Sequence, residues 1–173
     1  LAGLLSWVVT FFLPPQYDAV RWIVVSCIGF PLLYTLSETT VVGIGISRRT
    51  GFAMLAAISS FAINLVGNWF LIPHFGAAGA AVSTCISFWV FFVLRTEFSI
   101  YLWKSMPRLL LYAFTLACVL GAVIFTLFGE SASSLMMAYW AILLFAASYA
   151  FRGEVRDAVA FVLQKGRAAK VSR

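Results

Sequence analysis

Two apolar runs, 51–72 and 76–94, are separated only by Pro73, His74 and Phe75, and this spacing constrains the fold more than any other feature. Each run has close to the ~20 residues that an α-helix needs to cross the hydrocarbon core of a bilayer. Proline removes a backbone hydrogen bond from a helix interior, so we expect the first helix to stop at Pro73. The pattern therefore predicts a hairpin of two membrane helices.

The second run of this hairpin carries small residues at helical spacing. Small residues let helix backbones approach closely in lipid, where van der Waals packing replaces the hydrophobic drive. We therefore expect this helix to pack closely against its neighbours. The small-residue face comprises Gly76, Ala80, Ser83 and Ser87, and Gly79 and Thr84 flank it.

The first run carries Ser60, Asn64 and Asn68, which are four positions apart and therefore share one helix face. Two interpretations of the asparagines are open. They act as hydrogen-bonding glue between helices, worth about 0.6 kcal/mol each, or they line a path for a polar solute.

Composition assigns most of the chain to lipid. It is 63% hydrophobic and 10% charged, whereas a soluble domain has about 25% charged residues. Every backbone polar group in lipid must be paired internally, so runs of this length are expected to be helices. The sequence predicts an all-α integral membrane protein with a helical bundle over 1–151. The expected spans are 1–13, 19–46, 51–72, 76–94, 107–128 and 135–151.

The basic residues orient these spans. Arg48 and Arg49 follow the second span, Arg95 follows the fourth, and a basic tail follows the sixth. All but one of the 12 Lys and Arg residues lie on this side, which the positive-inside rule assigns to the cytoplasm. The tail, 152–173, is expected there as a short amphipathic helix on the inner leaflet or as a solvated segment. Because the chain opens inside an apolar run, we expect 1–13 to be a truncated span of a longer protein.

Enzyme and metal chemistry have little support in this sequence. Cys27, Cys85 and Cys118 each lie in an apolar run without CxxC spacing, which favours buried hydrophobic positions over metal or redox roles. Paired carboxylates, a Ser/His/Asp set and a glycine-rich phosphate loop are absent from the sequence. The sequence therefore predicts no catalytic residue, no metal site and no cofactor. Its basic residues lie between apolar runs, which indicates a membrane surface rather than nucleic acid as their partner.

Two ionisable residues lie near or within the second span. A carboxylate such as Glu38 costs about 2.5–3.5 kcal/mol to insert and should face a bundle interior or a watery cavity. It is interpreted as a cavity residue that handles protons, cations or sugar hydroxyls, as one half of a structural ion pair, or as a side chain that reaches the inner interface. Arg21 begins the same span and either faces an anionic solute or anchors the helix at the outer interface.

The hairpin resembles part of a known family. An asparagine-bearing helix followed by Leu-Ile-Pro-His-Phe-Gly and a Gly-Ala-Ala element is similar to the C-terminal half of polysaccharide flippases of the multidrug/oligosaccharidyl-lipid/polysaccharide transporter superfamily. Upstream, 14–19 resembles an outer element of that family, with prolines in place of its usual Phe-Gly, and Gly45 before Arg48 and Arg49 resembles its cytoplasmic turn. The resemblance covers about 1–105. The matching hairpin positions are Asn64, Asn68, Leu71, Ile72, Pro73, Phe75, Gly76, Gly79, Ala80, Ala81 and Thr84.

The resemblance implies the second six-helix bundle of a twelve-helix, two-lobed transporter. Such proteins flip lipid-linked oligosaccharides across the bacterial cytoplasmic membrane by alternating access. The implied partners are the lipid-linked oligosaccharide, membrane lipids, the N-terminal bundle of the same protein and a polysaccharide polymerase. Glu38 then becomes a candidate for ion coupling, and Asn64, Asn68 and Arg21 become candidates for lining the cavity. The implied structural motif is Pro73, Gly76, Gly79, Ala80 and Thr84.

Three alternatives stay open. Within transport, the chain is a cation-coupled multidrug exporter or a peptidoglycan-precursor flippase of the same superfamily. In another class, it is a membrane enzyme of envelope polysaccharide synthesis, which a large outer loop with clustered basic or catalytic residues would favour. In a third class, it is a membrane assembly subunit that transports nothing.

Overall fold

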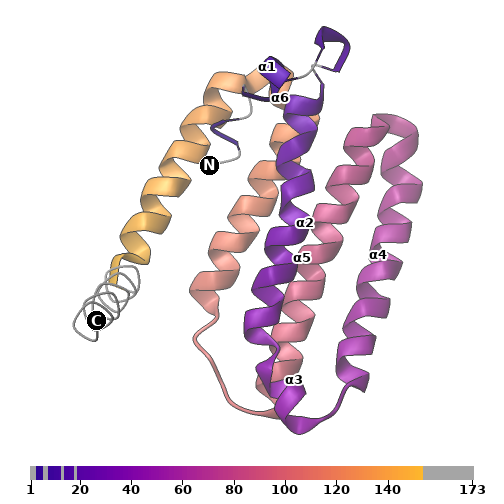
Figure 1. Ribbon diagram of the computed structural model, residues 1–173, viewed down its shortest axis with the longest axis vertical. Helices are drawn as coiled ribbons and strands as arrows, with labels where there is room; N and C mark the ends of the chain where they lie inside the picture. Colours follow the sequence, from indigo (N-terminus) through magenta and orange to yellow (C-terminus); the bar gives the residue numbers. More distant parts are fainter. Residues whose placement is uncertain (1–2, 6–7, 13, 18, 154–173) are drawn as a thin grey trace, which may run out of the picture. The chain divides into compact units, whose positions relative to one another are not determined.

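The computed structural model describes residues 3–5, 8–12, 14–17 and 19–153, and the regular elements in this part of the chain are all helices (Figure 1). This confirms the predicted all-α class. The predicted tail helix lies almost wholly outside the described residues. The helices are α1 (Val9–Phe12), the short 3-10 helix η2 (Pro15–Tyr17), α2 (Val20–Thr40), α3 (Val42–Ser47), α4 (Gly51–Phe75), α5 (Ala77–Leu102) and α6 (Leu109–Ala150).

Four helices in the described part of the chain are long and apolar enough to cross a membrane: Val20–Thr40, Gly51–Phe75, Ala77–Leu102 and Leu109–Gly129. A shorter apolar helix, Ser134–Ala150, follows them. These lengths and compositions indicate a membrane protein. The chain divides into two compact units, 1–140 and 141–173, and the first unit contains all four long helices.

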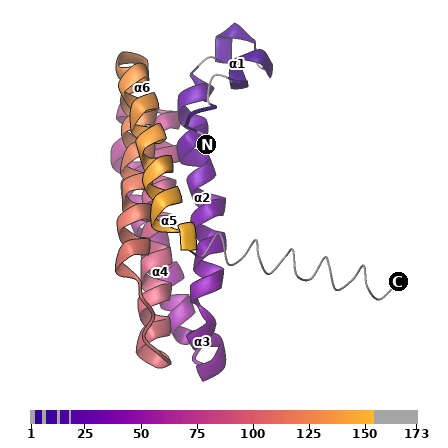
Figure 2. The same ribbon diagram turned by 90° about the vertical axis from the view of Figure 1, so that its left-hand side faces the viewer.

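Helix α5 is the centre of the first unit. It packs along α2 and α4, and it meets the first part of α6 through Trp89, whose indole N–H donates to Thr115 Oγ1 at 3.2 Å. Figures 1 and 2 show these helices running side by side. Phe92, Val82 and Cys85 of α5 are almost fully buried. Helix α5 therefore packs closely against α2 and α4, and its small residues Gly79, Ala81 and Ser83 are buried in these contacts.

The turn between α4 and α5 differs from the sequence-based expectation. Helix α4 continues through Pro73 to Phe75, and the chain turns at Gly76, whose φ is 54° and ψ is −129°. The missing N–H of Pro73 costs one hydrogen bond near the helix end, while the Gly76 N–H still donates to Ile72 O at 2.8 Å. The reversal needs backbone angles that only glycine adopts readily, so glycine rather than proline ends this helix.

The second predicted span, 19–46, is divided in the structure. Helix α2 ends at Thr40, and α3 runs from Val42 to Ser47. Arg48, which follows α3, has left-handed backbone angles (φ 52°, ψ 23°). A left-handed residue commonly ends a helix, although glycine or asparagine usually holds that position. The long apolar segment therefore consists of α2, which is long and apolar enough to cross a membrane, and a short separate helix at its end.

Helix α6 is folded back on itself. Tyr139 donates a 2.6 Å hydrogen bond to Ala117 O, 22 residues earlier, whereas a straight helix would separate these residues by about 33 Å. Its ring lies against Gly121, where an added Cβ would overlap the Tyr139 ring. Within the first unit, the residues from Ser134 to Trp140 therefore lie back against the Leu109–Gly129 stretch.

Replacing Gly76 with alanine tests the turn. A side chain at φ 54°, ψ −129° is strained, so Gly76→Ala should lower the free energy of unfolding by about 1–3 kcal/mol. Gly45→Ala is the matched control, because a Cβ at Gly45 meets open space within helix α3 and alanine favours helix. Thermal unfolding in detergent measures both variants, and equal stability of the two would contradict the assignment of the turn to Gly76.

Labelling at the two ends of α4 tests membrane crossing. Arg49 and His74 are both exposed and lie at opposite ends of this 25-residue helix, which is about 37 Å long. In a background without Cys27, Cys85 and Cys118, Arg49→Cys should react from the cytoplasmic side and His74→Cys from the outer side. Reaction of both thiols from the same side with an impermeant reagent would show that α4 does not cross.

Candidate functional site

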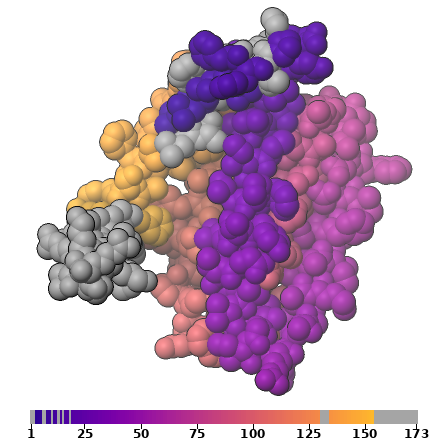
Figure 3. All heavy atoms as spheres, in the orientation of Figure 1, coloured from indigo at the N-terminus to yellow at the C-terminus, as the bar shows by residue number. Residues whose placement is uncertain are grey.

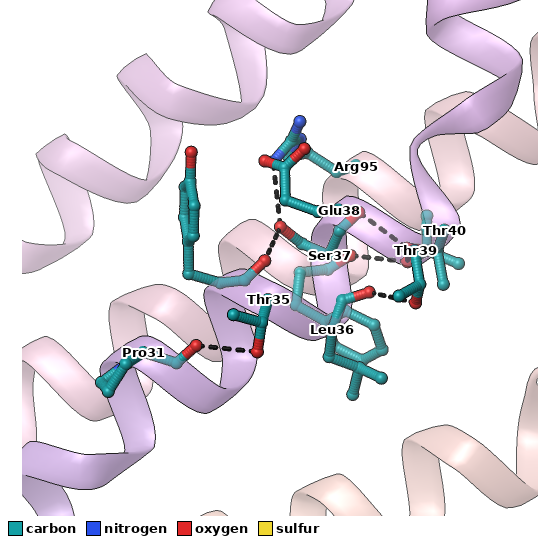
Figure 4. Close-up of polar contacts among 11 residues, drawn as sticks. Pro31, Thr35, Leu36, Ser37, Glu38, Thr39, Thr40 and Arg95 are labelled. Carbon is teal, nitrogen blue, oxygen red and sulfur yellow. Dashed lines mark hydrogen bonds and ion pairs between the residues drawn. The ribbon is translucent and has the colours of Figure 1, made fainter.

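An ion pair between two membrane-length helices is the most unusual feature of the first unit. Arg95 Nη1 of α5 lies 2.6 Å from Glu38 Oε1 of α2, and the two side chains point toward each other (Figure 4). The same nitrogen donates to Ser37 Oγ at 2.9 Å. Ser37 in turn donates its hydroxyl hydrogen to Tyr34 O at 2.7 Å. Successive residues of α2 therefore hold one edge of the arginine.

The two partners of the ion pair are buried to different extents. The Arg95 side chain is 11% exposed, whereas that of Glu38 is 47% exposed. The Arg95 Nε–H is also buried and donates to no acceptor among the described residues. A buried donor without an acceptor costs free energy, most of all on a charged group. The arginine is therefore fixed inside the bundle with part of its hydrogen-bonding capacity unused.

Aromatic rings fix the arginine from its other side. The Arg95 Cζ lies 4.9 Å from the centroid of the Phe91 ring, and Phe91 stacks on Tyr34 with an interplanar angle of 4°. A cation over an aromatic face is favoured by the ring's quadrupole. Phe30 and Phe88 continue the same contact between α2 and α5, with centroids 4.3 Å apart. The cation thus lies at one end of an aromatic contact between the two helices.

Uncharged contacts hold α2 and α5 together beyond the ion pair. The hydroxyls of Thr40 and Thr96 lie 2.7 Å apart and hydrogen-bond to each other. The Gly43 N–H of α3 donates to Ser99 Oγ at 2.9 Å, and a Cβ at Gly43 would overlap the Ser99 backbone oxygen. These contacts position the ends of α2 and α3 against α5 without using any charge.

The predicted asparagines lie at a different contact of α5. Asn64 Nδ2 donates to Thr84 Oγ1 and Ser87 Oγ, each at 3.3 Å, and Ser83 donates to Asn64 O at 3.0 Å. Asn68 Nδ2 donates to Asn64 Oδ1 at 2.9 Å. Asn64 therefore makes hydrogen bonds across the α4–α5 contact, Asn68 bonds to Asn64 within α4, and the structure does not bring the two asparagines together with Glu38.

The residues of the predicted structural motif lie in the same α4–α5 hairpin. Gly79 is buried, and a Cβ there would overlap the Leu71 carbonyl. Thr84 donates its hydroxyl hydrogen to Ala80 O at 2.9 Å. Pro73 and Gly76 are exposed at the turn. The motif thus determines how closely the two helices approach.

Arg21 is distant from the ion pair. It lies in the first turn of α2, with its Cζ 4.4 Å from the centroid of the Trp22 ring. Seventeen positions of helix separate it from Glu38, which corresponds to about 26 Å. The two ionisable residues predicted on this segment therefore lie at opposite ends of α2 and do not form one site.

Sequence reasoning missed Arg95 as a partner of Glu38. The sequence predicts Arg95 just beyond a span that ends at 94, whereas α5 continues to Leu102 and Arg95 is buried within this helix. The spacing of the small-residue face does not reach this position: Phe91 interrupts the steps of four that join Ser83 to Ser87. Ser83 and Ser87 contact α4, whereas Arg95 contacts α2 from a different face of α5. The periodicity of the sequence therefore gives no signal that places Arg95 inside the bundle.

Comparison of the chain with protein-family models, curated proteins and solved structures finds no match. Among the described residues, no group of three or more His, Cys, Asp and Glu side chains is arranged to hold a metal ion. The function therefore has to be argued from the geometry of the ion pair itself.

A double-mutant cycle measures how strongly the ion pair couples α2 to α5. Glu38→Gln and Arg95→Gln should each destabilise the protein by about 1–3 kcal/mol, because each leaves a buried or charged group without its partner. Their interaction energy should reach about 1–3 kcal/mol, in the range for residues in direct contact.

The matched control for this cycle is the pair of Glu97 and Arg108. Its N–O distance is also 2.6 Å, but both side chains are at least one-third exposed, so a coupling of about 0.2–1 kcal/mol is expected. Unfolding in detergent compares the two cycles. A coupling for Glu38 and Arg95 no larger than this control would contradict a strong buried interaction.

Proposed function

We propose that this chain is the C-terminal part of a transporter that flips or exports lipid-linked oligosaccharide units across the bacterial cytoplasmic membrane by alternating access. In this proposal it forms most of the second six-helix bundle of a twelve-helix protein. The observation that carries the proposal is the Glu38–Arg95 ion pair between apolar helices. Ionisable residues within such helices are costly and commonly mark the path of an ion or a polar solute.

The exposed side of the ion pair supports this proposal. Glu38 is accessible on α2, where Phe30 and Tyr34 are also more than two-fifths exposed. Figure 3 shows α2 along the face turned to the viewer, flanked by the neighbouring helices. A face that combines a carboxylate with aromatic rings is unlike a purely apolar surface made for lipid. We assign this face to the cavity between the two bundles.

The α4–α5 hairpin supports a rigid-body role. Asn64 makes interhelical hydrogen bonds with Thr84 and Ser83, and Gly79 makes a close backbone contact with Leu71, so that the two helices are tied into one body. Alternating access by rocking of two bundles requires that each bundle moves as a unit. Most of the side chains of α4 that point away from α5 are apolar and exposed, as expected for a helix that faces lipid or the other bundle.

Charge at one end of the first unit supports the proposed orientation. Arg48 and Arg49 follow α3, and Lys104 and Arg108 lie in or next to the connection from α5 to α6, at the same end of the first unit (Figure 1). The positive-inside rule assigns this end to the cytoplasm. We propose on this basis that the C-terminus is also cytoplasmic.

A transport assay with the complete protein that contains this chain tests the proposal. Proteoliposomes should move an undecaprenyl-diphosphate-linked oligosaccharide between leaflets, and an ion gradient should accelerate the movement. Glu38→Gln should lower the gradient-driven rate by about tenfold or more, equivalent to ~1.4 kcal/mol in the barrier. Glu97→Gln, which removes another helix-borne acid that is paired with an arginine, should retain the gradient dependence.

The outcomes of this assay separate the competing functions. Unchanged gradient dependence in Glu38→Gln would remove this residue from coupling. Failure to move the sugar lipid, together with export of cationic drugs, would contradict the flippase proposal and favour the multidrug exporter. Chemical conversion of the sugar lipid would favour the membrane enzyme.

A further inference from the structure

Arg95 uses only part of its capacity to bind anions. A guanidinium carries five N–H donors in a planar fork that matches an oxyanion through two parallel hydrogen bonds. Both hydrogen bonds described for Arg95 leave from Nη1, to Glu38 and to Ser37. Its Nε–H is buried and donates to no acceptor in the described part of the chain. The residue as a whole is nine-tenths buried. The present arrangement therefore does not satisfy the cation.

The two partners of the pair differ in how firmly they are held. Arg95 is enclosed by Ser37 and by the Phe91 ring, whereas nearly half of the Glu38 side chain is exposed. A glutamate has several rotatable bonds and can turn toward its exposed side without moving the backbone. The carboxylate is therefore the partner that can leave, and the guanidinium stays in place.

We propose that Arg95 is a binding site for a phosphate or diphosphate oxyanion, and that Glu38 is the resident counter-ion which this ligand displaces. A free carboxylate is a poor competitor, because Glu38 is the same chemical group and its tether gives it a high effective concentration. A phosphate group carries more negative charge and three strong acceptor oxygens. Such a ligand offers the guanidinium a bidentate contact in place of the single Nη1 contact with Glu38.

This inference goes beyond the proposed function, because it holds for any phosphate-bearing ligand and does not require transport. The same chemistry is available from a soluble diphosphate and from the head group of an isoprenyl lipid. It also predicts an effect of unusual sign. Removing the charge of Glu38 should strengthen ligand binding, because the carboxylate no longer competes with the ligand for Arg95. If the ion pair only held the helices together, a change of either partner would weaken ligand binding.

Calorimetric titration of the complete protein in detergent at fixed ionic strength tests the site. The probes are inorganic pyrophosphate and farnesyl diphosphate. Arg95→Gln should weaken binding of the probe by about tenfold or more, as expected for loss of a charge-assisted contact. Glu38→Gln should tighten binding several-fold, a gain that misfolding cannot produce. Acetate at equal ionic strength should not displace the probe.

The exposed pair again supplies the matched control. Glu97→Gln and Arg108→Gln change an ion pair of the same 2.6 Å length and should leave the affinity unchanged. Equal binding of the two probes would assign the site to a free oxyanion, and binding of farnesyl diphosphate alone would assign it to a lipid head group; both support the site.

Two results would overturn the inference: wild-type affinity in Arg95→Gln, or weaker binding in Glu38→Gln. Either result would leave the flippase proposal standing if sugar-lipid transport persists. Conversely, Arg95-dependent binding without transport would contradict only the proposed function.

Discussion

The cost of a charge in an apolar bundle determines how α2 and α5 must pack. Arg95 lies well inside a helix that is long and apolar enough to cross a membrane, and an unpaired cation there would be expensive. Its contacts with Glu38 and Ser37 require the two helices to approach closely. Small residues make that approach possible, because Gly29 lies against Cys85 and Gly43 against Ser99. Close packing and neutralisation of the charge therefore depend on each other.

Helix α5 can serve several neighbours because its faces carry different chemistry. Toward α4 it presents Ser83, Thr84 and Ser87, which make hydrogen bonds with the asparagine face. Toward α2 it presents the cation and Thr96. In lipid, apolar contact alone does not specify which helices associate, and interhelical hydrogen bonds contribute to that choice. The distribution of polar side chains around α5 thus indicates how one helix selects its partners.

Much of this architecture follows from the sequence, because the length and hydrophobicity of each apolar segment dictate a helix, whichever helices it packs against. The α4–α5 hairpin and its small-residue contact also follow, because their periodicity is local. The position of Arg95 did not follow, because a basic residue after an apolar run resembles a residue at the membrane edge. Only the tertiary contact with Glu38 distinguishes the two cases. The end of α4 is predicted at Pro73 because proline breaks the interior of a helix. That prediction is wrong because Pro73 lies near the helix end, where few later hydrogen bonds depend on its N–H, and α4 continues to Phe75.

Stability alone does not account for the ion pair. Replacing a buried pair by well-packed apolar residues is often neutral or stabilising, so such a pair is weak evidence for a structural role. The α2–α5 contact already has an uncharged hydrogen bond between Thr40 and Thr96, and the adjoining α3–α5 contact has one between Gly43 and Ser99. A third contact that adds two charges, and that leaves a buried donor of Arg95 unsatisfied, is costly to break by removing one partner but is expected to be replaceable by two apolar side chains with little loss of stability. The two charges add a site at which Arg95 can bind either Glu38 or another anion. A firmly held cation beside a partly exposed carboxylate is suited to exchange one anion for another, whereas a purely structural pair would be expected to bury both partners equally.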